Sequence, residues 1–151
     1  MHQDVIILIA EDDDGHATLI KKNLRRSGIG NPILHFRDGQ EVVDFLFIKG
    51  GGPHWEKGKG YLMLLDIRMP RLTGIEVLEK VKEDAELRKI PVIMLTTSDD
   101  PREIERCHIL GCSNYVPKPI ANEGFANTVK HLGLFLSIVQ VPTLNKETAV
   151  N

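Results

Sequence analysis

Five short runs of apolar residues recur along the 151-residue chain, and a longer stretch of mixed polarity separates each run from the next. They cover residues 5–10, 33–36, 61–65, 91–96 and 114–116. Runs of this length are typical of buried β-strands. Strands that alternate with helices favour a parallel sheet, because parallel neighbours need a crossover and the crossover helices cover the sheet. We therefore predict an α/β fold, a doubly wound (βα)5 arrangement with a parallel five-stranded sheet.

The stretches between these runs carry helix start signals. Residues 73–76 read Thr-Gly-Ile-Glu, which has the spacing of a capping box. Asp100 precedes Pro101, which fits a helix with proline at its first position. A last helix is expected from about residue 123 to residue 139. These signals predict helices between the strands and after the last one.

Net charge, the length of the apolar runs and the cysteine spacing argue against several classes of protein. The formal net charge of −2 gives no basic surface for nucleic acid. The apolar runs are far shorter than the roughly 18 residues of a membrane span, and the N-terminus lacks the apolar segment of a secretion signal. Cys107 and Cys112 match neither a metal-ligand pair nor a redox motif. We expect a cytoplasmic protein without nucleic-acid or membrane partners, with one domain over residues 1–140 and a tail, 141–151, that is extended or disordered.

Polar side chains follow four of the five predicted strands. Glu11 and Asp12 follow the first strand, Asp66 follows the third, Thr96 ends the fourth and Lys118 follows the fifth. Ligands of open parallel sheets bind beyond the carboxyl ends of the strands, so these side chains should converge. Two carboxylates about 4 Å apart would repel by about 4 kcal/mol at an effective dielectric near 20. We therefore expect positive charge among them.

Magnesium suits such a site, since it is usually held by one or two carboxylates together with water and phosphate oxygens. The ion would neutralise a phosphoryl group beside a carboxylate nucleophile. Asp66 is the candidate nucleophile because it stands at the mouth of a buried strand, whereas Asp13 and Asp14 are equally well explained as helix caps. Lys118 would pair with a phosphate or carboxylate oxygen, and Thr96 would donate its hydroxyl. The predicted reaction is phosphoryl transfer to Asp66.

The chain resembles the receiver domain of bacterial response regulators over about residues 5–136. The resemblance rests on the ordered set of Glu11-Asp12, Asp66, Thr96 and Lys118-Pro119. It implies a flavodoxin-like topology with strand order 2-1-3-4-5. It also implies a signalling protein of a two-component pathway, which takes a phosphoryl group from a sensor histidine kinase and catalyses no other reaction than its own phosphorylation and slow dephosphorylation.

The same resemblance implies a role for each site residue. Asp66 would be the phosphoacceptor, and Mg²⁺ would be bound by Asp12, Asp66, the backbone carbonyl of Arg68 and, through a water molecule, Glu11. Lys118 would be the phosphate partner, with Thr96 and Tyr115 as the switch residues. The peptide bond before Pro119 would be cis, which is inexpensive only before proline.

A narrower resemblance links the chain to response regulators of bacterial and cyanobacterial phytochrome kinases. It rests on residues 11–13, the long glycine-bearing loop before the third strand, and residues 132–142. It implies a homodimer made by the last helix and tail, with the tail as a candidate dimer arm that is exchanged between protomers.

The apolar pattern of the last helix supports a dimer independently. One helical face, expected to pack on the sheet, contains Phe125, Val129, Leu132, Leu136 and Val139. Three further apolar residues lie away from that face, namely Leu134, Phe135 and Ile138. An exposed apolar patch normally marks an interface, although isolated surface leucines are the alternative.

Two other functions fit less well. A phosphatase with an aspartyl nucleophile would commonly carry a second acid two residues later, where this chain has Arg68. A receiver-like binding module that is not phosphorylated would not need the complete set of site residues. No output domain is expected after residue 139, so the output would be protein–protein contact or phosphorelay.

Two features do not belong to this site. The loop at residues 49–60 is either a flexible surface loop or a partner-contact loop that carries Trp55, and this residue is better explained as a loop anchor than as a stacking platform. The histidines show no metal-ligand spacing and are expected on the surface or at helix caps; they are His2, His16, His35, His54, His108 and His131.

Overall fold

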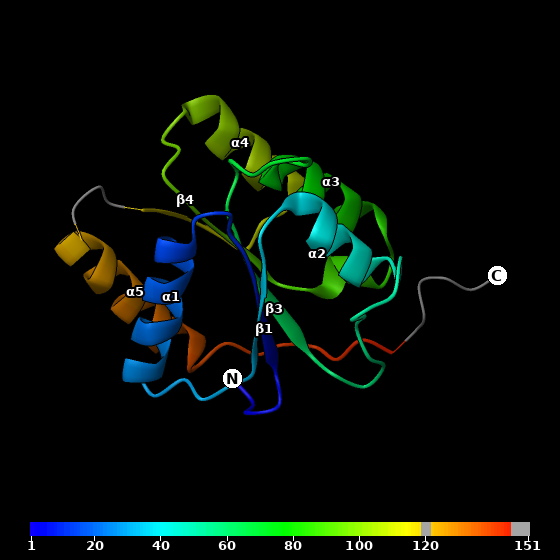
Figure 1. Cartoon of the computed structure of the whole chain (residues 1–151), viewed down its shortest axis with the longest axis horizontal. Helices are drawn as coiled ribbons and strands as arrows, with labels where there is room; N and C mark the ends of the chain where they lie inside the picture. Colours follow the sequence, from blue (N-terminus) through cyan, green and yellow to red (C-terminus); the bar gives the residue numbers. More distant parts are fainter. Residues whose placement is uncertain (119–121, 146–151) are drawn as a thin grey trace.

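A computed structural model describes residues 1–118 and 122–145. Five parallel strands form one sheet in the order β2-β1-β3-β4-β5 (Figure 1). They are β1 (Ile6–Ala10), β2 (Ile33–Phe36), β3 (Tyr61–Leu65), β4 (Val92–Thr96) and β5 (Asn114–Pro117). The predicted fold class and strand order are confirmed, and each strand end lies within one residue of its predicted position.

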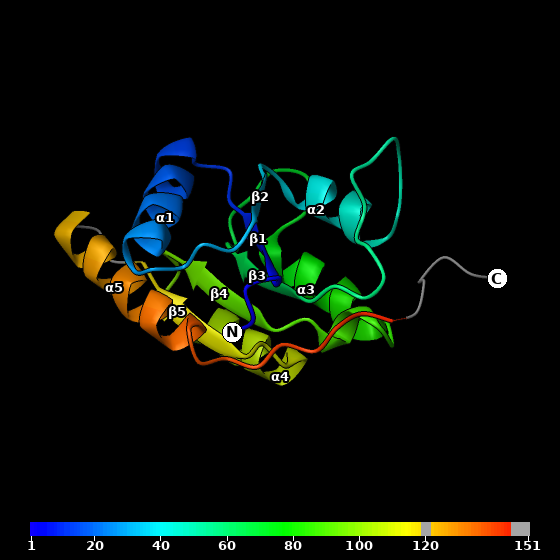
Figure 2. The same ribbon diagram turned by 90° about the horizontal axis from the view of Figure 1, so that it is seen from below.

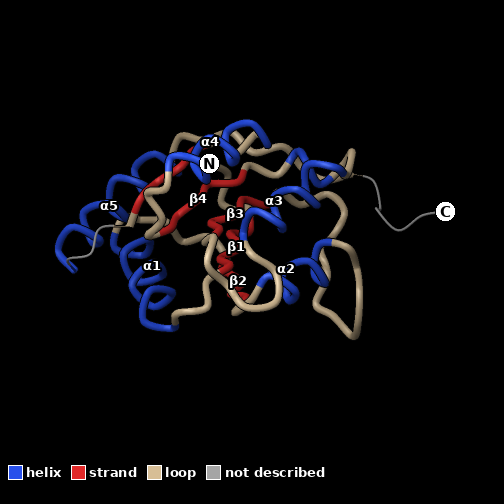
Figure 3. Tube along the Cα trace, turned by 90° about the horizontal axis from the view of Figure 1, so that it is seen from above, coloured by secondary structure: helices blue, strands red, loops and turns tan. Residues whose placement is uncertain are grey.

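Helices cover both faces of the sheet (Figure 3). They are α1 (Asp14–Arg26), α2 (Gly39–Leu46), α3 (Gly74–Glu83), α4 (Pro101–Leu110) and α5 (Asn122–Leu136), with a short 3-10 turn, η1 (Leu87–Lys89), before β4. α1 and α5 pack on one face, and α2, α3 and α4 pack on the other. None of the helices in the described part of the chain is long and apolar enough to cross a membrane.

The sheet divides the core into two clusters. Ile7 and Ile9 of β1 face the α1 and α5 side, whereas Leu8 and Ala10 face the other helices. All four side chains are buried, which accounts for the continuous apolar run of this strand. Because all five strands are parallel, their carboxyl ends lie at the same edge of the sheet.

α5 ends three residues earlier than predicted, and the hydroxyl of Ser137 donates a 2.6 Å hydrogen bond to the carbonyl of Leu134 just beyond the end. The face predicted to pack on the sheet is buried from Phe125 to Leu136, and Val139, although outside the helix, still packs against the same cluster. The other apolar residues of this region are exposed, as predicted: Leu134 by 57%, Phe135 by 40% and Ile138 by 73%.

The long loop and the tail both pack against the domain. Trp55 is buried in the α2–α4 cluster, so it anchors the loop. Residues 141–145 run along the amino-terminal end of the sheet (Figure 2), where Thr143 forms an antiparallel bridge with Gly60. Leu144 is fully buried, and its backbone exchanges hydrogen bonds with Gly58 (2.6 Å) and Lys59 (2.9 Å). Residues 146–151 lie outside the described part of the chain.

Candidate functional site

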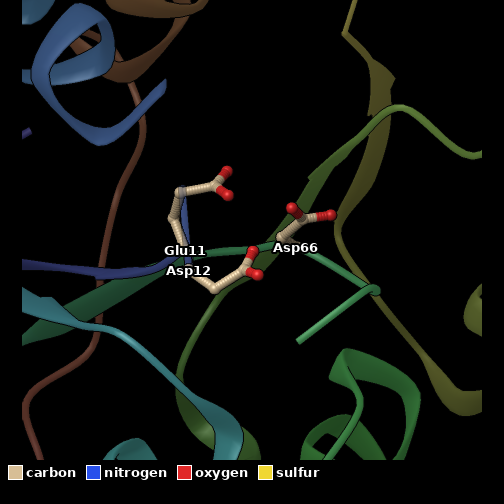
Figure 4. A group of neighbouring side chains, drawn as sticks. All are labelled: Glu11, Asp12 and Asp66. Carbon is tan, nitrogen blue, oxygen red and sulfur yellow. The ribbon is translucent and has the colours of Figure 1, made fainter. Parts of the chain in front are cut away.

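Three carboxylates meet at the carboxyl edge of the sheet. Glu11 and Asp12 follow β1, and Asp66 follows β3; their side chains point toward one another (Figure 4). One carboxylate oxygen from each residue lies within 4.8 Å of the others. Glu11 and Asp66 are buried, whereas Asp12 is exposed. The group therefore presents oxygen ligands to a cation that approaches from solvent.

Backbone hydrogen bonds fix the two buried carboxylates in place. The N–H of Asp66 donates to the carbonyl of Ala10 (3.0 Å), and the N–H of Glu11 donates to Phe36 (2.9 Å). These bonds extend the sheet by one residue beyond β3 and β1. The Asp66 side chain accepts a 2.7 Å hydrogen bond from the N–H of Ile67, so this carboxylate has a defined orientation.

Lys118 brings positive charge into the cluster from the end of β5. Its side-chain ammonium donates hydrogen bonds to Glu11 Oε1 and to Asp66 Oδ2, the latter at 3.1 Å. Its backbone N–H donates to the carbonyl of Thr96 (2.7 Å), which keeps the lysine beside β4. Lys118 is 5% exposed, so this contact compensates buried negative charge away from solvent.

Burial raises the pKa of Glu11 to about 7. The negative charge of Asp66 acts in the same direction, while the hydrogen bond and positive charge of Lys118 lower the pKa. Desolvation has the largest effect because it disfavours the ionised form of a carboxyl group. A bound cation would favour the ionised form of Glu11 and so lower its pKa. The buried position of Glu11 therefore suits a site that binds a cation.

The predicted switch residues lie on two neighbouring strands, β4 and β5. Thr96 ends β4 and is fully buried, and its hydroxyl accepts a 3.4 Å hydrogen bond from the N–H of Ser98. The Tyr115 hydroxyl donates to the carbonyl of the same Ser98 (2.8 Å). Burial raises the pKa of Tyr115, so its hydroxyl stays protonated and can donate. Hydrogen bonds to the backbone of Ser98 thus connect Thr96 with Tyr115.

Arg68 lies two residues after Asp66, and its guanidinium group faces α4. There it pairs with Glu103 at 2.8 Å, with 64% of the arginine side chain exposed. The side chain is therefore engaged away from the carboxylates, and only the backbone carbonyl of Arg68 remains as the predicted metal ligand. The peptide bond before Pro119 lies outside the described residues.

Two histidines contact the site, contrary to the expectation that they are surface or cap residues. His35 Nε2 donates a 2.7 Å hydrogen bond to the carbonyl of Glu11, and His16 Nδ1 lies 3.3 Å from Lys118 Nζ. Neither contact has a signal in the sequence, because the partners are 24 and 102 residues away along the chain.

Comparisons with known proteins identify the family. The family model for the response regulator receiver domain matches residues 7–130. The chain belongs to the receiver domain family. Among curated proteins, this receiver domain is 35% identical over 127 residues to the probable methanogenesis regulatory protein FilR2 of Methanothrix harundinacea, covering 84% of this chain and 80% of FilR2.

Solved receiver structures have the same fold. A receiver domain from Rhodospirillum rubrum is 45% identical, with a TM-score of 0.87 over 93% of this chain and 99% of its own. The Mn²⁺-bound response regulator Rcp1, a protein of Synechocystis, is 28% identical with a TM-score of 0.82, over 91% and 99% of the two chains. The phosphorylated cyanobacterial phytochrome response regulator RcpA is also 28% identical with a TM-score of 0.82, over 93% and 99%.

Proposed function

We propose that this receiver domain accepts a phosphoryl group on Asp66 from a sensor histidine kinase. The observation that carries the proposal is the position of Asp66, whose carboxylate lies at the end of β3 beside two further carboxylates and 3.1 Å from Lys118 Nζ. An Asp66 oxygen would attack the phosphorus of a phosphohistidine, the P–N bond would break, and an aspartyl phosphate would form. The phosphorylated state of RcpA supports the same chemistry.

The carboxylates fit a divalent cation. When all are ionised, Glu11, Asp12, Asp66 and Lys118 together carry two more negative than positive charges. We propose Mg²⁺ as the ion, held by Asp12, Asp66 and the backbone carbonyl of Arg68, with Glu11 acting through a water molecule. When bound, the ion would supply charge neutralisation for the transferring phosphoryl group. The Mn²⁺-bound form of Rcp1 supports a divalent cation in this family.

The remaining polar residues would read the phosphorylated state. Lys118 would donate to a phosphoryl oxygen, and Thr96 would donate its hydroxyl to another. Because Thr96 and Tyr115 both bond to Ser98, a movement of Thr96 would be transmitted to Tyr115 on the outer strand. Phosphorylation would thus bias a surface between two states.

Intact-mass spectrometry tests the phosphoacceptor directly. The protein is incubated with acetyl phosphate, with and without Mg²⁺, beside an Asp66→Asn variant. We expect a gain of one phosphoryl group that requires both Mg²⁺ and Asp66. Incorporation at the same level in Asp66→Asn would place the site elsewhere, and no gain under any condition would favour a binding module that is not phosphorylated.

We also propose that the kinase is of the phytochrome type, as the similarity to RcpA suggests. The test is phosphoryl transfer from a panel of autophosphorylated histidine kinases. Transfer from a phytochrome kinase should be faster than transfer from kinases of other input classes. Equal rates across the panel would remove the pathway assignment and leave the phosphoacceptor proposal intact.

We further propose a homodimer through α5 and the tail that follows it, which would cover the exposed apolar patch of Leu134, Phe135 and Ile138. Ile138→Glu should reduce the dimer fraction in analytical ultracentrifugation, because it buries a charge in an apolar interface. Ile109→Glu is the matched control, since Ile109 on α4 is exposed by 69% and lies outside the patch. Equal loss of dimer in both variants would refute this choice of interface.

A further inference from the structure

His16 lies in the first turn of α1, at the rim of the acidic cluster. Its backbone N–H donates to Asp13 Oδ1 (3.0 Å), which completes the helix cap. Its ring reaches toward the site, so that Nδ1 lies 3.3 Å from Lys118 Nζ and 4.0 Å from Glu11 Oε1. The imidazole therefore contacts the buried ammonium group that the site depends on.

The chemistry of the two groups fixes the direction of this hydrogen bond. An ammonium group has three N–H donors and no lone pair, so Lys118 must donate and His16 Nδ1 must accept. An imidazole that accepts at Nδ1 is neutral and carries its proton on Nε2. The contact thus requires one particular tautomer of His16.

All three donors of Lys118 are engaged. The acceptors are Glu11 Oε1, Asp66 Oδ2 and His16 Nδ1. A phosphoryl oxygen on Asp66 can bond to this ammonium group only if it takes the place of one acceptor. The phosphoryl oxygen is attached to Asp66 itself, and an ionised Glu11 attracts the ammonium group by its charge as well as by its hydrogen bond. The uncharged imidazole is held by its hydrogen bond alone, so it is the acceptor that gives way.

The ring of His16 is held in this position from the other side by α5. Its centroid lies 5.6 Å from that of Phe125, with an interplanar angle of 47°. Phe125 is 4% exposed and belongs to the core, so it is a fixed surface for the ring. Packing therefore orients Nδ1, and the hydrogen-bonding role can be separated from the packing role by substitution.

We propose that His16 is a positioning residue that holds the third N–H of Lys118 while Asp66 is unphosphorylated and releases it to a phosphoryl oxygen. This inference rests on the proposed function of Asp66 and adds a residue of α1 to it. The hydrogen bond to His16 stabilises the unphosphorylated arrangement, so it opposes the phosphorylated one. Loss of this acceptor should favour the phosphorylated arrangement.

Two variants separate the acceptor from the ring. His16→Phe keeps the aromatic contact with Phe125 and removes the acceptor, whereas His16→Asn keeps a short acceptor near the position of Nδ1 and removes the ring. The probe is beryllium trifluoride, an analogue of the aspartyl phosphoryl group, titrated at fixed Mg²⁺ by calorimetry. His16→Phe should bind the analogue about fivefold more tightly than wild type, a ratio that corresponds to one ordinary hydrogen bond. His16→Asn should restore an affinity close to that of wild type.

An affinity of His16→Phe equal to or below that of wild type would overturn the inference, as would tighter binding by both variants. A long-range ¹H–¹⁵N spectrum of the wild-type protein without ligand gives an independent test. We expect an unprotonated Nδ1 on His16, and a proton on that atom would overturn the inference while leaving Asp66 as the phosphoacceptor. Conversely, an Asp66 that accepts neither phosphate nor the analogue would refute the proposed function, whatever the tautomer of His16.

Discussion

Gly74→Ala should damage both the stability of the domain and its site. Gly74 is the first residue of α3, and its N–H donates to the carbonyl of Ile67 (2.8 Å). A methyl group at this position would lie 2.0 Å from the carbonyl oxygen of Asp66 and 2.8 Å from its carbonyl carbon. Even weak C–H contacts with a carbonyl oxygen need about 3.3 Å, so the two backbone segments must separate by more than about 1 Å.

The size of that displacement sets the expected loss in the free energy of unfolding. Backbone shifts forced by an extra methyl group cost about 1 to 3 kcal/mol, and we expect about 3 kcal/mol because the obstacle is backbone on both sides. For a chain of this length the loss corresponds to a fall in Tm of about 6 to 12 °C. A displacement of about 1 Å at the nucleophile should also slow phosphorylation about 100-fold, because Asp66 would no longer be aligned with Lys118.

Urea unfolding gives the stability, and the initial rate of Mg²⁺-dependent phosphate incorporation gives the activity. Gly30→Ala is the matched control, since a methyl group there would have no heavy atom within 4 Å. If Gly74→Ala were as stable as Gly30→Ala to within about 0.5 kcal/mol, the value typical of neutral surface substitutions, the argument from close approach would be wrong.

Four further predictions follow from burial. Leu144→Ala should lower the free energy of unfolding by about 2 to 5 kcal/mol in urea titrations, whereas Thr143→Ala, at an exposed position, should change it little; equal stability of the two would mean that the tail does not pack. Because burial raises the pKa of Glu11 from 4.5 to about 7, the folded protein binds more protons than the unfolded chain in this range, so without metal its stability should fall as pH rises from 4.5 to 7. Protonation of the same carboxyl group should weaken Mg²⁺ binding, so the Mg²⁺ affinity measured by calorimetry should fall from pH 8 to pH 6 as protons compete with the ion. An unchanged slope of affinity against pH in Glu11→Gln would contradict the assignment of this effect to Glu11. Burial also raises the pKa of Cys107 to about 11, so iodoacetamide at pH 8 should leave this thiol unmodified in the native protein and alkylate it in urea, as read by mass spectrometry.

The sequence predicts the strands and the carboxylates well because both depend on local pattern. Thr73 and Glu76 form the capping box that their spacing indicates. Asp66 stands out because a carboxylate follows a fully apolar strand, and parallel strands bring such residues to one edge. These features need no knowledge of which distant segments meet.

The features that the sequence did not predict depend on tertiary contacts. His16 reads as an ordinary residue of a first helical turn, and only the approach of Lys118, 102 residues later, gives its ring a partner. Leu144 is a single apolar residue among polar neighbours, so no periodicity marks it as buried. The early end of α5 has the same origin, because Val139 remains apolar and partly buried after the helix has stopped.

The position of Leu144 has a mechanical consequence for α5. This helix packs with α1 on one face of the sheet, yet the segment that follows it passes the end of the sheet and places Leu144 in the core of the opposite face. α5 cannot move away from α1 independently unless residues 137–143 become more extended or Leu144 leaves its buried position. Motions of α5 large enough to remodel its exposed face are therefore coupled to the packing of the core cluster on the opposite face of the sheet, and native-state hydrogen exchange should show α5 opening together with the 143–145 segment.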